Sequence, residues 1–166
     1  MGLLDWVIGT RRPAAALVPR PVSALYAALL AVNRPGAHFA VRDGRPDGVD
    51  LVAHLKFAEP DWYGYFAKLS PRTAFRVFLR LDEARAEVRW HEQECQVEQL
   101  AGVFYYARVE ALRSGQPLPE QKSWVFEHSR PHRAARALSS QSVRGQLRAA
   151  VIESGWTWRA VPEGDL

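Results

Sequence analysis

Cysteine is almost absent from the chain, since only Cys95 occurs among its 166 residues. One thiol cannot form an internal disulfide bond, so the sequence excludes a disulfide-stapled fold and is typical of a reducing compartment. No apolar run approaches the roughly 20 residues that a membrane-spanning helix needs. The start, MGLLDWVIGTRR, places a short apolar part before its charges, the reverse of a secretory signal peptide. We therefore expect a cytoplasmic protein without a membrane span.

Motifs of the common enzyme classes are also missing. The sequence has no GxSxG, no phosphate-binding loop, no GxGxxG, and no CxxC, HxH or HExxH pair. The histidines fall before a strand, on the polar side of a predicted strand or in a basic loop, where exposure or local hydrogen bonding is typical. The sequence thus predicts no catalytic residue, no metal site and no cofactor, and favours a non-enzymatic protein.

Lysine is scarce as well. Of 22 basic residues only Lys56, Lys68 and Lys122 are lysine, and the net charge is +4. The arginine fork favours contacts with phosphate or carboxylate groups. Alanine and proline, which bind no phosphate, are abundant too, so codon usage is the preferred explanation of the arginine bias.

Helical spacing of apolar residues appears in two segments. Pro21–Asn33 begins with a proline that suits a first helical position. Ser140–Ser154 is followed by Gly155, where glycine often ends a helix. The stretch EPDWYGYFAKLS predicts one or two more helical turns. The two apolar stripes consist of Val22, Leu25, Tyr26, Leu29 and Leu30, and of Val143, Leu147, Ala150 and Val151.

Alternation with a period of two predicts strands. AHFAV and VDLVAHLKF flank the turn RDGRPDG, and AFRVFLRLD and AEVRWHEQECQVEQL flank DEAR, so both pairs predict antiparallel hairpins. GVFYYARVEAL fits a strand or a helix, whereas KSWVFEHS and WTWRAV are strand candidates.

This order of elements predicts an α+β fold, with a mainly antiparallel sheet of about five or six strands and helices packed on one face. Residues 1–20 are predicted to form an apolar turn and a Pro/Ala/Arg linker, and residues 21–166 a single α+β domain. Residues 1–9 either dock on a partner or second copy of the chain, or pack on their own sheet.

The stretch VRWHEQECQVEQL, residues 88–100, combines His91, Cys95 and several glutamates. In a helix, His91 and Cys95 would share a face and could chelate a metal. In a strand they lie about 13 Å apart, too far to share one ion. The preceding hairpin favours the strand, and a bulge near residues 91–93 would return Cys95 and Val97 to the core. The side chains then expected to face water are Glu92, Glu94, Gln96 and Glu98.

Aromatic residues gather in three places along the chain. They are interpreted as core, as the lining of a small-ligand pocket or as an exposed partner surface; the core is favoured and the others stay open. The candidates for a pocket or partner surface are Trp62, Tyr63, Tyr65, Tyr105, Trp156 and Trp158.

The run between Glu127 and Glu153 contains no acidic residue. Arg144 and Arg148 are four residues apart on the predicted helix, so we expect them on one exposed stripe. Such a surface would bind an anionic partner, either an acidic protein or a nucleic acid, although a solvated face explains it as well. The candidate residues are Arg130, Arg133, Arg136, Arg144 and Arg148.

Four stretches resemble an uncharacterised family of small proteins from high-GC bacteria. They are DGVDLVAHLKF, DWYGYFAKL, FRVFLRLDEARAEVRW and GWTWRAV, and the resemblance covers about residues 22–161. The start MGLLDWVIG is similar to the MGLFDxLFG starts of many bacterial proteins of unknown function. The resemblance implies no activity and no functional residues.

These observations leave three classes of function. The leading one is a binding or adaptor module that acts through a protein or anionic surface, with a protein partner or self-association. The alternatives are a small-ligand-binding domain with an aromatic-lined pocket, and a nucleic-acid-binding protein that uses the segment 130–148.

Overall fold

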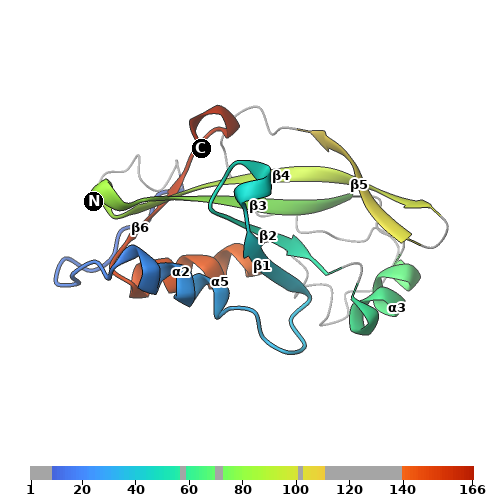
Figure 1. Ribbon diagram of the computed structural model, residues 1–166, viewed down its shortest axis with the longest axis horizontal. Coiled ribbons are helices and arrows are strands. Elements are labelled where there is room, and N and C mark those ends of the chain that lie inside the picture. Colours follow the sequence, from blue (N-terminus) through green and yellow to red (C-terminus); the bar gives the residue numbers. More distant parts are fainter. Residues whose placement is uncertain (1–8, 57–58, 70–72, 101–102, 111–139) are drawn as a thin grey trace.

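The computed structural model describes residues 9–56, 59–69, 73–100, 103–110 and 140–166 (Figure 1). A mainly antiparallel sheet of six strands combines with helices, which confirms the predicted α+β class. Residues 1–8 and the strand candidate KSWVFEHS lie outside the described residues. The elements are α2 (Val22–Leu30), β1 (Phe39–Asp43), β2 (Leu51–Leu55), α3 (Pro60–Leu69), β3 (Thr73–Asp82), β4 (Glu87–Leu100), β5 (Val103–Glu110), α5 (Ser140–Glu153) and β6 (Thr157–Ala160).

The long strand β4 organises the sheet. The strand order is β1-β2-β3-β4-β5, with antiparallel neighbours throughout. β6 pairs with β4 in parallel over residues 87–90, whereas β5 pairs with β4 over residues 94–100. The strand β3 occupies one edge of β4. The other edge of β4 is shared, because β6 pairs with its first part and β5 pairs with its second part.

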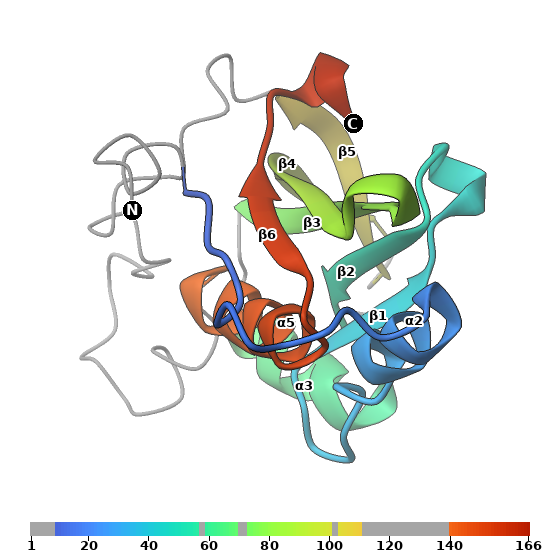
Figure 2. The same ribbon diagram turned by 90° about the vertical axis from the view of Figure 1, so that its left-hand side faces the viewer.

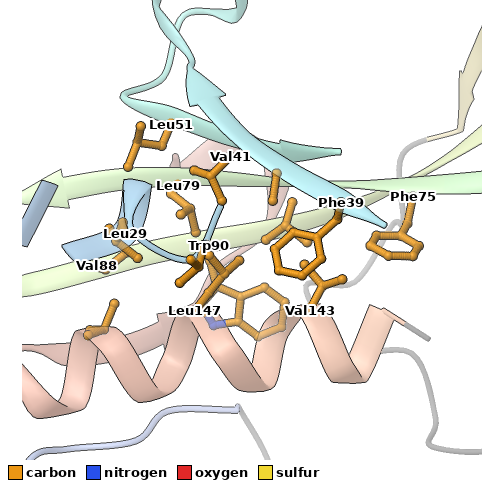
Figure 3. Close-up of a cluster of buried hydrophobic side chains, with 14 of the residues drawn as sticks. Leu29, Phe39, Val41, Leu51, Phe75, Leu79, Val88, Trp90, Val143 and Leu147 are labelled. Carbon is orange, nitrogen blue, oxygen red and sulfur yellow. The ribbon is translucent and has the colours of Figure 1, made fainter. Parts of the chain in front are cut away.

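The register places apolar residues of four strands on one face of the sheet, called the first face here. Residues directly opposite one another in antiparallel strands point to the same side. One row across the sheet consists of Val41, Ala53, Val77 and Glu92, and the adjacent row includes Leu51, Leu79 and Trp90. These apolar side chains belong to the main core cluster. Figure 3 shows labelled members of the cluster, Val41, Leu79 and Trp90 among them, gathered between the strands and α5.

The two longer helical stripes meet this cluster. Leu25 and Leu29 of α2 and Val143 and Leu147 of α5 are fully buried in it, as their spacing predicted. α2 and α5 lie side by side (Figures 1 and 2).

The end of α5 explains the glycine that follows the helix. Gly155 has a left-handed backbone (φ 77°). The N–H of Trp156 donates to the carbonyl of Val151 at 3.1 Å and that of Gly155 to Ile152 at 3.0 Å, which is a Schellman motif. The turn leads the chain directly from α5 into β6.

Residues 10–20, predicted as a linker, are fastened to the domain at both ends. Arg11 and Trp158 exchange backbone hydrogen bonds of 2.7 and 2.8 Å. The N–H of Arg20 donates to the carbonyl of Ser154 at 2.9 Å, and the indole N–H of Trp156 donates to the carbonyl of Arg20 at 2.8 Å. This segment therefore runs along α5 and β6 instead of standing free.

Two expectations for β4 are wrong. Pairing with β3 is unbroken from residue 87 to 96, so no bulge falls near residues 91–93; the register shift lies between Gln96 and Val97, against β5. Without a bulge, Glu92 stays on the same face as Trp90, and it is only 4% exposed where water contact was expected. Cys95 is fully buried as expected, but on the opposite face of the sheet.

Candidate anion-binding site

The second face of the sheet combines an apolar floor with cationic side chains. One row across it consists of Arg42, Val52, Phe78 and His91. Val52 and Phe78 are buried and form a small apolar cluster with Val49, against which Leu166 packs. This cluster is separate from the main core.

A concavity of about 390 Å³ lies over this floor. Its walls come from the β1–β2 turn and from alternate residues of β3 and β4, whose side chains point to one side. The lining residues are Asp47, Gly48, Val49, Arg76, Phe78, Arg80, His91, Gln93 and Leu166.

The β1–β2 turn supplies the carboxylate of Asp47, which is the only carboxylate side chain among the described lining residues. The turn includes a short 3-10 helix, Arg45–Asp47, and ends at Gly48, whose left-handed backbone (φ 75°) suits glycine. Arg42 contacts the Asp47 carboxylate at 2.7 Å and Arg76 contacts it at 3.4 Å. One acid therefore serves two arginines.

Arg76 has further contacts that hold it in place. Its guanidinium donates to the side-chain oxygen of Gln93 at 3.0 Å and lies over the ring of Phe78, 5.0 Å from the ring centroid. Only 17% of its side chain is exposed. Asp47, Gln93 and Phe78 thus help to fix the orientation of this cation.

Arg80 differs from the other two arginines, because among the described residues no carboxylate lies within ion-pair distance of it. Its guanidinium donates to the backbone carbonyl of Gly48, and its Nε is buried without an acceptor. The nearby carboxylate of Asp50 accepts instead from the backbone N–H of Leu81 at 2.7 Å. A guanidinium has five N–H donors, so most of the donor capacity of Arg80 is not used by the described residues.

Only Arg144 and Arg148, of the five arginines predicted as an anionic-partner surface, lie within the described residues. Arg130, Arg133 and Arg136 lie outside the described residues. Arg148 is exposed, but the side chain of Arg144 is only 15% exposed, so the predicted common exposed stripe is wrong. Arg144 turns toward the sheet because a buried carboxylate, that of Glu92, lies on the first face.

Glu92 and Arg144 form a buried ion pair of 2.9 Å. The guanidinium of Arg144 also lies 5.2 Å from the ring centroid of Trp90. Burial raises the pKa of Glu92, while the charge of Arg144 and the hydroxyl of Ser140 act in the opposite direction. The pair is a structural contact between α5 and β4, and it lies on the other face from the concavity.

Four of the six aromatic candidates, Trp62, Tyr63, Trp156 and Trp158, have described side chains, and they lie in two separate parts of the fold. Trp156 and Trp158 are 1% and 2% exposed and belong to the main core, with Trp158 stacked on Trp90 at 5.2 Å. Trp62 and Tyr63 lie on α3, which Figure 1 places at the opposite end of the sheet from β6. Nothing is described for the side chains of Tyr65 and Tyr105.

Within the described ranges no group of three His, Cys, Asp or Glu side chains is placed to hold a metal ion. Burial lowers the pKa of His38 to about 4, lowers the pKa of His54 and raises the pKa of the Cys95 thiol. None of the described helices has the length and apolar character to cross a membrane.

Arg76 and Arg80 were visible in the sequence as polar residues of an alternating strand, but they were not predicted as a site. The strand pattern placed both on the face opposite the core. It did not show that the β1–β2 turn and residues 91–93 lie beside them, because that depends on the register of four strands.

Comparisons of the chain with protein-family models, with curated proteins and with solved structures gave no match. The resemblance to a family of small proteins from high-GC bacteria therefore stays a prediction.

Proposed function

We propose that this protein is a non-enzymatic binding module that holds an anionic group of its partner in the concavity on the second face. The observation that supports this most directly is Arg80, a guanidinium that lines the concavity without a carboxylate partner among the described residues. Charge-assisted hydrogen bonds from arginine to an anion are stronger and more specific than neutral ones.

The surrounding residues support the same proposal. Arg42 and Arg76 already share the single carboxylate of Asp47. An anion that binds near Arg80 therefore meets more positive than negative charge. Arg76 is held by Gln93 and Phe78, so little side-chain entropy is lost when an anion arrives.

The test is an NMR titration of the full chain with sodium acetate and, separately, with inorganic phosphate at constant ionic strength. We expect amide shifts localised to residues 47–49, 76–80 and 91–93. Arg80→Gln removes the unpartnered cation and should abolish these shifts with either probe.

Arg85→Gln is the matched control. Arg85 is an exposed arginine of the β3–β4 turn, paired with Asp82 at 3.1 Å, and it does not line the concavity. Its variant should titrate like the wild type. Shifts that are absent with both probes, or that are the same in Arg80→Gln and the wild type, would overturn the proposal.

A further inference from the structure

We infer that the concavity takes a small organic monocarboxylate with an apolar body, with the carboxylate at Arg80 and the body on the floor formed by Phe78 and Val49. This inference rests on the proposed function and names its ligand class. Three features of the site lead to it: the floor, the charge balance and the size.

The floor is apolar, whereas a site for a bare inorganic anion would present donors on every side. Phe78 and Val49 are each 8% exposed, and both line the concavity. Leu166 packs against the same cluster and lines the concavity as well. Polar side chains surround this floor, so a ligand that fits both parts has a charged end and a small apolar end.

The charge balance favours a single negative charge. Among the described side chains that line the concavity, the cationic groups are those of Arg76 and Arg80, and the anionic group is that of Asp47. One positive side-chain charge is left over, which a monocarboxylate neutralises, whereas a phosphate dianion or a nucleic acid would bring excess negative charge next to Asp47.

The size agrees with a small ligand. A volume of about 390 Å³ is near the lower end of the range of roughly 300–1,000 Å³ found for small-molecule sites. The ring of Phe78 is already covered on one side by the guanidinium of Arg76. Because Phe78 and Val49 are each only 8% exposed, the uncovered floor is small, which suits a ligand whose apolar body is no larger than one ring or a short alkyl chain.

Arg80 reaches the ligand from the wall. Because its guanidinium is anchored to the carbonyl of Gly48, its remaining N–H groups are held at the rim of the floor. A carboxylate that meets this fork places the attached apolar body over Phe78. The side-chain amide of Gln93 and the ring of His91 form the opposite wall.

The experiment compares three probes on the full wild-type chain: acetate, benzoate and inorganic phosphate. Dissociation constants come from NMR titrations at one pH and ionic strength. We expect benzoate to bind about tenfold more tightly than acetate, because its ring removes apolar surface from water. Phosphate should bind no more tightly than acetate.

Two variants separate the charged end from the apolar end. Arg80→Gln should weaken acetate and benzoate together, by about tenfold or more. Phe78→Leu should weaken benzoate by about threefold or more while acetate stays within about twofold. Phe78→Met provides a second test of the floor if the leucine variant loses its native amide spectrum.

The outcomes distinguish this inference from the function on which it rests. If acetate and benzoate bind equally and both depend on Arg80, the ligand class is wrong and the anion-binding function stands. Tighter binding of phosphate, or of an added oligonucleotide, than of benzoate would also overturn the ligand class. If none of the probes binds in the concavity, both proposals fail.

Discussion

The guanidinium of Arg144, on α5, lies 2.9 Å from the carboxylate of Glu92, on β4, and both groups are removed from water. Glu92 is 4% exposed and lies in a row of otherwise apolar side chains on the first face. The helix therefore brings a cation to the carboxylate that this row of the sheet buries. The pair explains why an arginine expected at the surface points inward.

Arg144→Met should destabilise the fold strongly at neutral pH. Removing one partner of a buried ion pair leaves the other charge uncompensated, which typically costs about 3–5 kcal/mol. Arg148→Met changes an exposed residue of the same helix and should stay within about 0.5 kcal/mol of the wild type. Urea unfolding of both variants measures the difference, and equal losses would contradict the structural role of the pair.

Glu92→Gln should change the pH dependence of stability. Burial raises the pKa of Glu92 above its ordinary value of 4.5, so the folded chain keeps a proton that the unfolded chain releases. The stability from this group is fully present below the unfolded pKa and is lost as the pH rises through the folded pKa. Glutamine does not titrate. As the pH rises from about 4 to about 7, the free energy of unfolding of the wild type should therefore fall relative to that of Glu92→Gln. A difference between the two proteins that does not change with pH would refute this.

His38 should act in the opposite direction at acidic pH. Its pKa falls from 6.5 to about 4 in the folded chain, so between these values the unfolded chain binds the extra proton. The free energy of unfolding then decreases as the pH is lowered, by about 3 kcal/mol at most. In His38→Gln this part of the pH dependence should disappear. The check is a comparison of unfolding midpoints of the two proteins at about pH 7 and about pH 4.

Cys95 should be inert toward thiol reagents in the folded protein. Its side chain is fully buried, and burial raises the pKa of the thiol, so little thiolate is present at neutral pH. A disulfide reagent should label it slowly in buffer and rapidly in urea. Cys95→Ala should cost about 1 kcal/mol, because the deleted sulfur leaves a small cavity. Fast labelling of native protein would show that the thiol is accessible.

Two glycines near each other in the sequence should respond oppositely to alanine. Gly145 lies within α5, and a Cβ there would meet no atom within 4 Å, so Gly145→Ala should stabilise the helix by up to about 1 kcal/mol. Gly155 has a positive φ, and a Cβ there would lie 2.8 Å from the carbonyl oxygen of Val18. Gly155→Ala should lower the melting temperature while Gly145→Ala raises it. A loss in both would disagree with the described backbone.

Local sequence pattern predicted the elements well where one face of each is apolar. The spacing of Leu25 and Leu29, and of Val143 and Leu147, predicted two helices whose buried residues are those in the core. The alternation in residues 75–90 predicted the β3–β4 hairpin in the same way. Such patterns report which side of an element faces apolar neighbours.

The pattern failed where a polar residue is buried because of a distant partner. In the sequence, Glu92 fits the pattern of an exposed residue of a strand. Nothing near it indicates that Arg144, 52 residues further along the chain, pairs with it. The concavity could not be predicted from the sequence for a similar reason. Its lining residues extend from Asp47 to Leu166, and only the strand register brings them together.

The hydrogen bond from the indole of Trp156 to the carbonyl of Arg20 joins residues that are 136 positions apart. At a synthesis rate of roughly 5–20 residues per second, Trp156 leaves the ribosome on the order of ten seconds after Arg20. During that interval α5 and β6 do not yet exist, so the part of the apolar side of α2 that packs on α5 and the edge of β4 at residues 87–90 remain uncovered on the nascent chain. We expect the nascent chain to be a substrate for chaperones until α5 and β6 have been made, and the segment 10–20 to reach its place among the last steps of folding.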